Sequence, residues 1–338
     1  MELGANVNKE NNDGETPLFN ACKSGNVATV KYLVEHGANV NQALINGKTP
    51  LFIASEYENE SIVKYLVEHG ANVNKENNNG DTSLTIACES GSDNIIKYLI
   101  EHGADMNKEN NNGDTPLIIV CKFVNETIVK WLVEHSANVN KGNNNGDTPL
   151  TIACKSGSDN IIKYLIEHGA DIKKGNIYGE TPLLFACKND NKTLIKYLVE
   201  HGTNVNKELS NGKTPLFIAC EFGNEALVKY LVEHGADVNK ENINGETPLF
   251  FACENGKENA VKYLIEHGAD VNKENINGET PLFITFNSVN ETIVKYLVEH
   301  GANINKESSY GETPLFSAIH TVFDVQFYNE HKANKKKN

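Results

Sequence analysis

Nine histidines recur at one fixed register, and histidine is a metal ligand and a general base. They stand 33 residues apart, at His36, His69, His102, His135, His168, His201, His234, His267 and His300. Zinc needs three or four ligand atoms about 2.0 Å from one ion, whereas stacked helices lie about 8–10 Å apart. No cysteine or aspartate pattern completes a site beside them. We therefore expect no bound metal. Instead, each histidine should lie in the last turn of a helix, where its protonated ring interacts favourably with the helix dipole.

Seven cysteines also share one register, at Cys22, Cys88, Cys121, Cys154, Cys187, Cys220 and Cys253, and Ser55 takes that place once. Neighbouring copies would lie about one repeat apart, beyond the ~7 Å Cα separation that a disulfide allows. We expect buried, reduced thiols that act as small hydrophobic side chains. No serine or cysteine stands with histidine and aspartate outside these registers, so we expect no catalytic residue and no enzyme.

Two tripeptides, Gly47-Lys48-Thr49 and Gly212-Lys213-Thr214, imitate the end of a phosphate-binding loop. Gln42 and Lys207 stand where that loop requires its first glycine, so nucleotide binding is rejected and no cofactor is expected.

The asparagines of four glycosylation sequons are better interpreted as helix N-caps, because no secretory route is indicated. They are Asn59, Asn125, Asn191 and Asn290.

The composition argues against several classes of partner. The formal net charge is −14, all 31 basic residues are lysine, and the mean hydropathy is −0.44. An acidic chain without arginine favours neither nucleic acid nor an anionic membrane surface. No apolar run approaches the ~18 residues of a membrane span, and the first residues do not resemble a signal peptide. We expect a monomeric cytoplasmic protein, with the nucleus as the alternative.

The elements that must position these residues come from a repeat of 33 residues. A glycine followed two residues later by Thr-Pro-Leu recurs ten times, with Ser83 replacing the proline once, and all 9 prolines of the chain lie in this motif. The motif glycines are Gly14, Gly47, Gly80, Gly113, Gly146, Gly179, Gly212, Gly245, Gly278 and Gly311. A second motif, Lys-Tyr-Leu-Val-Glu-His-Gly-Ala-Asn-Val-Asn at 64–74, recurs with the same period. Such a period indicates stacked repeats rather than one large core.

Each repeat predicts two helices and a turn. Thr148 fits an N-cap and Pro149 the first position of a short helix. A second helix carries apolar residues at helical spacing and closes at a glycine such as Gly70. Its predicted caps include Asn26, Asn59, Ser92, Asn125, Ser158, Asn224 and Asn290. Asn-Gly pairs such as Asn79-Gly80 fit tight hairpin turns between repeats.

The Gly-x-Thr-Pro-Leu and Gly-Ala-Asp-Val-Asn phrases resemble the ankyrin repeat over residues 11 to about 320. The resemblance implies an all-α solenoid with short β-hairpins, stacked as a curved superhelix. The family usually has a histidine after Thr-Pro-Leu. This chain has Phe19, Phe52, Thr85, Ile118, Thr151, Leu184, Phe217, Phe250, Phe283 and Phe316 there, so we expect apolar burial to replace the polar contact.

The predicted domain organisation follows from the repeat register. Residues 1–10 are interpreted as the remnant of a preceding repeat, 11–307 as nine ankyrin repeats, and 308–338 as a degenerate capping repeat with a lysine-rich tail. Repeat one keeps apolar residues on its outer flank, where a terminal capping repeat normally carries polar ones. Asp324, Gln326 and Asn329 replace the usual apolar positions of a last helix.

Asn239 and Asn272 resemble the asparagine that a hydroxylase modifies in some ankyrin repeats. The alternative, which we favour, is an asparagine that serves the hairpin.

Residues that vary between copies within this fixed frame are the candidates for recognition. Where the fold would expose its concave face, the end of the first helix reads Lys23, Glu56, Glu89, Lys122, Lys155, Lys188, Glu221, Glu254 and Asn287. The predicted partner-binding residues are Tyr57, Lys122, Phe123, Lys155, Tyr178, Lys188, Phe222 and Tyr310. The three lysines predict a basic strip for an acidic or phosphorylated segment of a protein partner. The alternative is that they only balance Asp114, Asp147 and Glu180.

Two function classes remain. The favoured class is a non-enzymatic scaffold or adaptor that binds a protein along the concave groove. The alternative is the ankyrin portion of a larger protein that carries a catalytic, channel or ubiquitin-ligase-linked domain.

Overall fold

The computed structural model describes residues 5–287 and 290–319, in which two kinds of helix alternate. The first helices of the repeats are α1 (Pro17–Lys23), α3 (Pro50–Glu56), α5 (Ser83–Ser90), α7 (Pro116–Lys122), α9 (Pro149–Ser156), α11 (Pro182–Lys188), α13 (Pro215–Phe222), α15 (Pro248–Glu254), α17 (Pro281–Asn287) and α19 (Pro314–Ile319). The second helices are α2 (Val27–Glu35), α4 (Glu60–Glu68), α6 (Asp93–Glu101), α8 (Glu126–Glu134), α10 (Asp159–Glu167), α12 (Lys192–Glu200), α14 (Glu225–Glu233), α16 (Glu258–Glu266) and α18 (Glu291–Glu299). Helix bounds thus follow the repeat motif.

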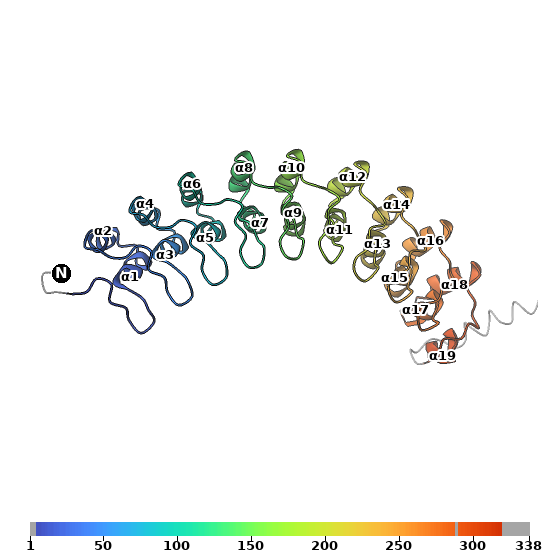
Figure 1. The fold of residues 1–338 in the computed structure, drawn as a ribbon. Coiled ribbons are helices and arrows are strands. Elements are labelled where there is room, and N and C mark those ends of the chain that lie inside the picture. The colour runs from blue at the N-terminus through green and yellow to red at the C-terminus, as the bar shows by residue number, and fades with distance from the viewer. Residues whose placement is uncertain (1–4, 288–289, 320–338) are drawn as a thin grey trace, which may run out of the picture. The chain divides into compact units, whose positions relative to one another are not determined.

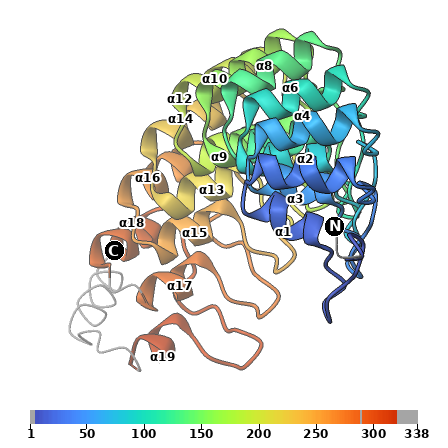
Figure 2. The ribbon, with the colours of Figure 1, turned by 90° about the vertical axis from the view of Figure 1, so that its left-hand side faces the viewer.

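The chain forms two compact units, Met1–Asn176 and Ile177–Asn338. Within the first unit each first helix contacts the next, from α1 through α9, and α2, α4 and α6 contact one another in the same order. Within the second unit the first helices α11 to α19 stack in the same way. In each unit the first helices form one layer and the second helices another (Figure 1), and α2, α4 and α6 lie side by side (Figure 2). The predicted helical repeat solenoid is therefore confirmed.

The core of each repeat lies between its two helices and those of its neighbours. The leucine of the Thr-Pro-Leu motif is fully buried, as at Leu51, and so are Ile62, Val63 and Leu66 of the second helix. Burying one such side chain contributes about 1.5–3 kcal/mol. Because each repeat touches only its neighbours, these contributions add along the stack.

Threonine caps begin most first helices, as predicted. The Thr148 hydroxyl accepts a hydrogen bond from the backbone N–H of Thr151. Thr214 and Thr247 make no such bond.

The prediction that apolar burial replaces the polar contact after Thr-Pro-Leu is wrong at three positions. Phe316 exposes 50% of its surface, and Thr85 and Thr151 make polar contacts instead. The Thr82 and Thr85 hydroxyls lie 3.1 Å apart, and those of Thr148 and Thr151 lie 3.4 Å apart. Threonine is small enough to be buried and still reach the hydroxyl of the cap.

The predicted caps of the second helices are confirmed in part. The side chains of Asn26, Asn125, Asn224 and Asn290 accept from the backbone N–H three residues on. The prediction is wrong for Ser92, Ser158 and Asn59, which make no side-chain cap bond. Asn59 instead donates from Nδ2 to the carbonyl of Cys22, at 2.8 Å, and so ties two repeats together.

The loops between repeats are tight turns, which we term fingers, and the predicted β-hairpins are not confirmed. No strand occurs in residues 5–287 or 290–319. In one finger Asn77 N–H donates to Asp81 O at 2.9 Å, and Gly80 N–H donates to Asn77 O at 3.0 Å. The next finger adds a single bond, from Asn111 N–H to Asn79 O at 2.9 Å. One backbone bond to each neighbour is too few for a strand ladder.

Gly80 is required in its finger for two reasons. Its φ is +77°, in the left-handed region, and a Cβ there would lie 2.8 Å from the backbone nitrogen of Asn111.

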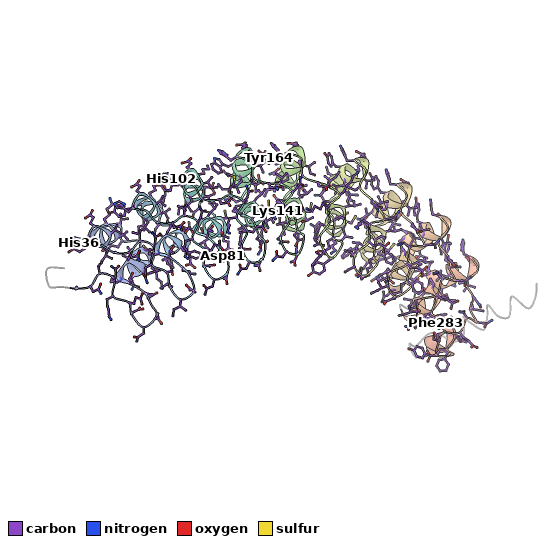
Figure 3. The ribbon with its side chains drawn as sticks, in the orientation of Figure 1. His36, Asp81, His102, Lys141, Tyr164 and Phe283 are labelled. Carbon is purple, nitrogen blue, oxygen red and sulfur yellow. The ribbon has the colours of Figure 1, made fainter. Side chains whose placement is uncertain are left out.

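Asp81 of this finger lies on the loop side of its unit, whereas His36, His102 and Tyr164 lie in the layer of second helices (Figure 3).

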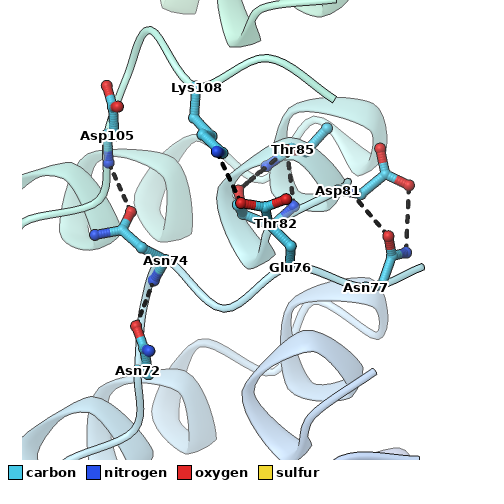
Figure 4. A network of polar contacts seen from close by, with 9 residues as sticks. All are labelled: Asn72, Asn74, Glu76, Asn77, Asp81, Thr82, Thr85, Asp105 and Lys108. Carbon is cyan, nitrogen blue, oxygen red and sulfur yellow. Dashed lines mark hydrogen bonds and ion pairs between the residues drawn. The ribbon is translucent and has the colours of Figure 1, made fainter. Parts of the chain in front are cut away.

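Asparagine side chains join consecutive repeats (Figure 4). Asn74 donates from Nδ2 to Gly103 O at 2.8 Å, and its Oδ1 accepts from Asp105 N–H at 2.9 Å. Asn239 makes the same two bonds, to Gly268 O and from Asp270 N–H, both at 2.8 Å. Asn239 lies in a turn, as Lys240 N–H donates to Asp237 O at 3.4 Å, and its amide in addition bridges to the following repeat.

The outer flank of repeat one is open. A hollow of about 880 Å³ is lined by residues that include Lys9, Pro17, Ala21 and Leu33. Pro17 is exposed, whereas Pro50 at the same register is buried. Of the predicted capping repeat at 308–338, the structure describes residues 308–319, which include α19. Asp324, Gln326, Asn329 and the lysine-rich tail lie outside the described residues, as do residues 1–4 of the predicted remnant.

Candidate functional site

The fingers and the ends of the first helices meet on one face of each unit, which we term the finger face. Lys48 follows the finger glycine, and its Nζ lies 3.0 Å from Oε1 of Glu56 at the end of α3. The same register brings Lys213 Nζ within 3.3 Å of Glu221 Oε2. The two varied positions of a repeat are thus close in space and form one surface.

In the first unit this face carries a polar hollow of about 520 Å³. Its lining includes Lys48, Asp81 and Glu89, with finger asparagines Asn77, Asn79, Asn110, Asn111 and Asn112. Burial raises the pKa of Glu89, and the nearby Asp81 carboxylate adds to that rise. The lining offers hydrogen-bond donors and acceptors without a nucleophile held against a base. Such a surface suits recognition rather than bond chemistry.

The five aromatic residues predicted for binding are all exposed. Tyr57, Phe123, Tyr178, Phe222 and Tyr310 each expose between 47 and 75% of their surface. Tyr57 and Phe123 follow directly on the ends of α3 and α7 in the first unit. Phe222 ends α13, and Tyr178 and Tyr310 lie in fingers of the second unit. Exposed aromatic rings are frequent anchors of protein interfaces.

The three predicted strip lysines differ in their surroundings. Lys122 and Lys155 belong to the first unit, and both side chains are exposed. Lys122 Nζ lies 5.9 Å from the centroid of the Phe123 ring, and neither lysine has an ion pair among residues 5–287 and 290–319. Lys188 belongs to the second unit, where its Nζ lies 3.0 Å from Glu180 Oε1. The charge-balancing alternative therefore holds for Lys188.

Asp114 and Asp147 are engaged elsewhere and do not pair with Lys122 and Lys155. Asp114 Oδ1 accepts from Asn143 Nδ2 at 2.7 Å, and Asp147 Oδ1 accepts from Asn176 Nδ2 at 2.8 Å. Aspartate is one methylene shorter than the glutamate of the Lys188 pair. Its carboxylate therefore serves the neighbouring finger and leaves the lysine ammonium to solvent.

Val124 was missed by the sequence reasoning. Its φ is +59°, a conformation that is strained for a β-branched residue, and its side chain is exposed. Other repeats place Gly25, Gly91 and Gly157 at this register, and Glu58 and Asp190 also stand there with φ of +57° and +50°. Of these non-glycine residues only Val124 is β-branched. The sequence signal was a valine where a glycine is usual.

The histidine column lies on the opposite side, in the second helices. Each ring follows the end of its helix, and Nδ1 of His36 donates to Tyr32 O at 2.7 Å, since a carbonyl only accepts. The same ring stacks on Tyr32 with centroids 4.1 Å apart. Across the part of the chain that the structure describes, no group of three or more His, Cys, Asp or Glu is placed to hold a metal ion.

All seven cysteines are buried, as predicted. Burial raises the pKa of Cys22, Cys154, Cys187 and Cys253 to about 12. Thiols with so high a pKa carry almost no thiolate at neutral pH and are poor nucleophiles.

Finger isoleucines are the second feature that the sequence reasoning missed. Ile45, Ile177, Ile243 and Ile276 stand two residues before the finger glycine and are exposed. An apolar, β-branched residue at a turn tip was the available signal, because turns favour polar residues and glycine.

In the described residues no helix has both the length and the apolar character that crossing a membrane requires. A family model that describes three consecutive ankyrin repeats matches the chain five times, at residues 1–77, 40–110, 103–176, 173–242 and 249–325. A comparison with curated proteins gave no match.

Proposed function

The chain belongs to the ankyrin-repeat family, and we propose on that premise that it is a non-enzymatic scaffold or adaptor that binds a protein partner on its finger face. Ankyrin repeats are generally protein–protein interaction modules and typically not catalytic. In the first unit the proposed centre of the contact is the segment 122–124 at the end of α7.

Backbone strain at Val124 is the observation that carries this proposal. A non-glycine residue in the left-handed region costs about 1–2 kcal/mol, and such strain clusters at sites of function. Here the strain presents two adjacent apolar side chains, Phe123 and Val124, to solvent beside the exposed Lys122. None of the three is needed to bury the core.

Charge supports an acidic or phosphorylated segment as the partner's contact. Lys122 and Lys155 stand one repeat apart, about 10 Å for stacked helices. Neither forms an ion pair within residues 5–287 and 290–319, and the Glu89 carboxylate attracts Lys122 only at longer range. Lysine binds phosphate and carboxylate as a point charge. Tyr57, two repeats before Phe123 at the same register, provides a further anchor on this face.

Lys188, Tyr178, Phe222 and Tyr310 belong to the second unit. We assign the aromatic three to partner contact there. The Glu180 pair removes Lys188 from the proposed site.

The test is a selection with a display library of random 12-residue peptides on the whole chain and on Lys122→Glu/Lys155→Glu. Lys163→Glu/Lys196→Glu is the matched control, because it makes the same charge change at exposed positions of second helices. We expect peptides rich in aspartate, glutamate and aromatic residues that bind the wild type and the control but bind the variant at least about tenfold more weakly. Unchanged circular dichroism shows that the variant folds.

Two results would overturn the proposal. One is a set of acidic peptides that bind wild type and variant equally. The other is a wild-type selection that enriches no peptide at all.

A further inference from the structure

The residue two positions before the finger glycine has a structural role in the first unit. There Asn78, Asn111 and Asn144 each donate from Nδ2 to the carbonyl of the same position in the preceding finger. The acceptors are Ile45 O at 3.1 Å, Asn78 O at 3.0 Å and Asn111 O at 2.9 Å. Asparagine at this register therefore satisfies a carbonyl and links one finger to the next.

Two neighbouring fingers of the second unit abandon this arrangement. Ile243 and Ile276 occupy the register, and each exposes 68% of its surface. The backbone bonds between fingers remain, from Ile243 N–H to Asn211 O at 3.1 Å and from Ile276 N–H to Asn244 O at 2.9 Å. Isoleucine has no side-chain donor, so the finger loses a hydrogen bond and gains exposed apolar surface. Folding alone would favour asparagine here.

The charges around these two isoleucines are acidic. At the register where Lys48 pairs with Glu56, and Lys213 pairs with Glu221 in the preceding repeat, the repeat of Gly245 has Glu246 and Glu254, two like charges. The nearby Lys240 and Lys273 are engaged, with Nζ atoms 2.7 and 2.8 Å from the carboxylates of Glu208 and Glu241. Glu279 repeats the acidic residue in the next finger. In the described part of the chain, no cation pairs with Glu246, Glu254 or Glu279.

We infer that Ile243 and Ile276, flanked by Glu246, Glu254 and Glu279, form a second docking surface, which binds a basic segment of a protein partner through apolar side chains between its lysines or arginines. Consecutive stacked repeats stand about 10 Å apart, which equals about three residues of an extended chain. The partner segment thus has an apolar residue at every third position. The inference rests on the proposed function only in that the finger face binds protein segments.

The charge preference is opposite to that of the surface around Lys122. The two surfaces therefore select different peptides from one library, and either can fail alone.

The decisive variant is Ile243→Asn/Ile276→Asn, examined by the same random 12-residue display selection. Asparagine is the residue that the first unit uses at this register, so the variant should fold and keep its melting temperature. We expect a class of peptides with an apolar residue at every third position and basic residues between them, which binds the wild type and binds the variant at least about tenfold more weakly. Ile45→Asn, at an exposed finger of the first unit, is the matched control and should leave this class unaffected.

A second variant tests the charge. Glu254 is exposed, and Glu254→Lys should weaken the same basic peptides by about threefold or more in fluorescence anisotropy, with the difference shrinking at high salt. Acidic peptides selected by the surface around Lys122 should bind this variant as well as the wild type.

Three outcomes overturn the inference. Ile243→Asn/Ile276→Asn binds every peptide class as tightly as the wild type, the peptides that it binds more weakly are acidic, or Ile45→Asn weakens binding of the same class. A basic class that survives in Lys122→Glu/Lys155→Glu while the acidic class disappears supports both surfaces separately.

Discussion

The Lys188 ammonium lies 3.0 Å from Oε1 of Glu180, across eight residues of the same repeat. Lys122 and Lys155 hold the same register and have Asp114 and Asp147 at the place of Glu180, yet those aspartates accept hydrogen bonds from asparagines of the next finger. One missing methylene thus distinguishes a lysine held in an ion pair from two lysines that face solvent.

Lys188→Met should have little effect on either stability or binding. Its ion pair is partly exposed, with 35 and 22% of the two side chains accessible, and such pairs contribute less than about 1 kcal/mol. Urea denaturation at low and high salt measures the first quantity, and anisotropy with an acidic peptide the second. A loss of acidic-peptide binding as large as that of Lys122→Glu/Lys155→Glu would return Lys188 to the site.

Val124→Gly should stabilise the folded chain and weaken its binding to the partner. Relief of left-handed strain is worth about 1–2 kcal/mol, and the greater freedom of glycine in the unfolded chain offsets up to about 1 kcal/mol. We expect a net gain of roughly 0.5–1 kcal/mol in urea denaturation, together with weaker peptide binding.

Ser136→Gly is the control for that substitution. Ser136 has φ +72° after the end of α8, where the other repeats have glycine. It should give a similar gain with binding unchanged. If Val124→Gly bound as tightly as the wild type, the strained valine would have no part in recognition.

The same Thr→Val substitution in two helix caps should have different effects on the free energy of unfolding. Thr148→Val removes a bond to the Thr151 N–H and should cost about 1 kcal/mol. The Thr247 hydroxyl is buried and has no hydrogen-bond partner, so Thr247→Val should be neutral or stabilising by up to about 1 kcal/mol. Urea midpoints of the two variants give the comparison, and equal losses would show that the Thr247 hydroxyl is hydrogen-bonded in solution.

Repeat one should open before the rest of the first unit. A hollow lies beside Pro17, Ala21 and Leu33, so within residues 5–287 and 290–319 no repeat packs on that flank of α1 and α2. Solenoid stability is roughly a sum of neighbour contributions. Amide hydrogen exchange should be at least about tenfold faster in α1 and α2 than in α5 to α8. Equal protection across these helices would contradict the prediction.

Stability should fall in alkaline solution. Burial raises the pKa of Cys154 from its ordinary 9.0 to about 12, so above pH 9 the unfolded thiol releases a proton that the folded thiol keeps. The unfolded state then binds fewer protons, and the free energy of unfolding falls as pH rises from 9 to about 12.

Cys154→Ser should reduce that slope by up to about 1.4 kcal/mol per pH unit. Ser55 already occupies this register, with its hydroxyl donating to Leu51 O at 2.9 Å. Urea denaturation at several pH values measures the slopes, and identical slopes for wild type and variant would contradict the prediction.

The repeat motif made the helices predictable, because proline at the first position and glycine after the last are local signals such as Pro149 and Gly70. The bridging role of Asn74 was not predictable, since its amide reaches backbone groups 29 and 31 residues further on. The exposure of Phe123 was predictable from its variability within a fixed frame. That of Ile243 and the strain of Val124 depend on the backbone of a loop, which hydrophobic periodicity does not report.

The finger turns also bear on the chemical ageing of the protein. Asn-Gly is a sequence prone to deamidation, because the glycine nitrogen can attack the preceding side-chain amide and form a succinimide. In the finger of Asn79 that nitrogen belongs to Gly80, and it is held in a hydrogen bond to Asn77 O at 3.0 Å. The reaction must therefore wait for the finger to open. Isoaspartate accumulating at each Asn-Gly pair would record, over days of storage, how often each finger leaves its folded conformation.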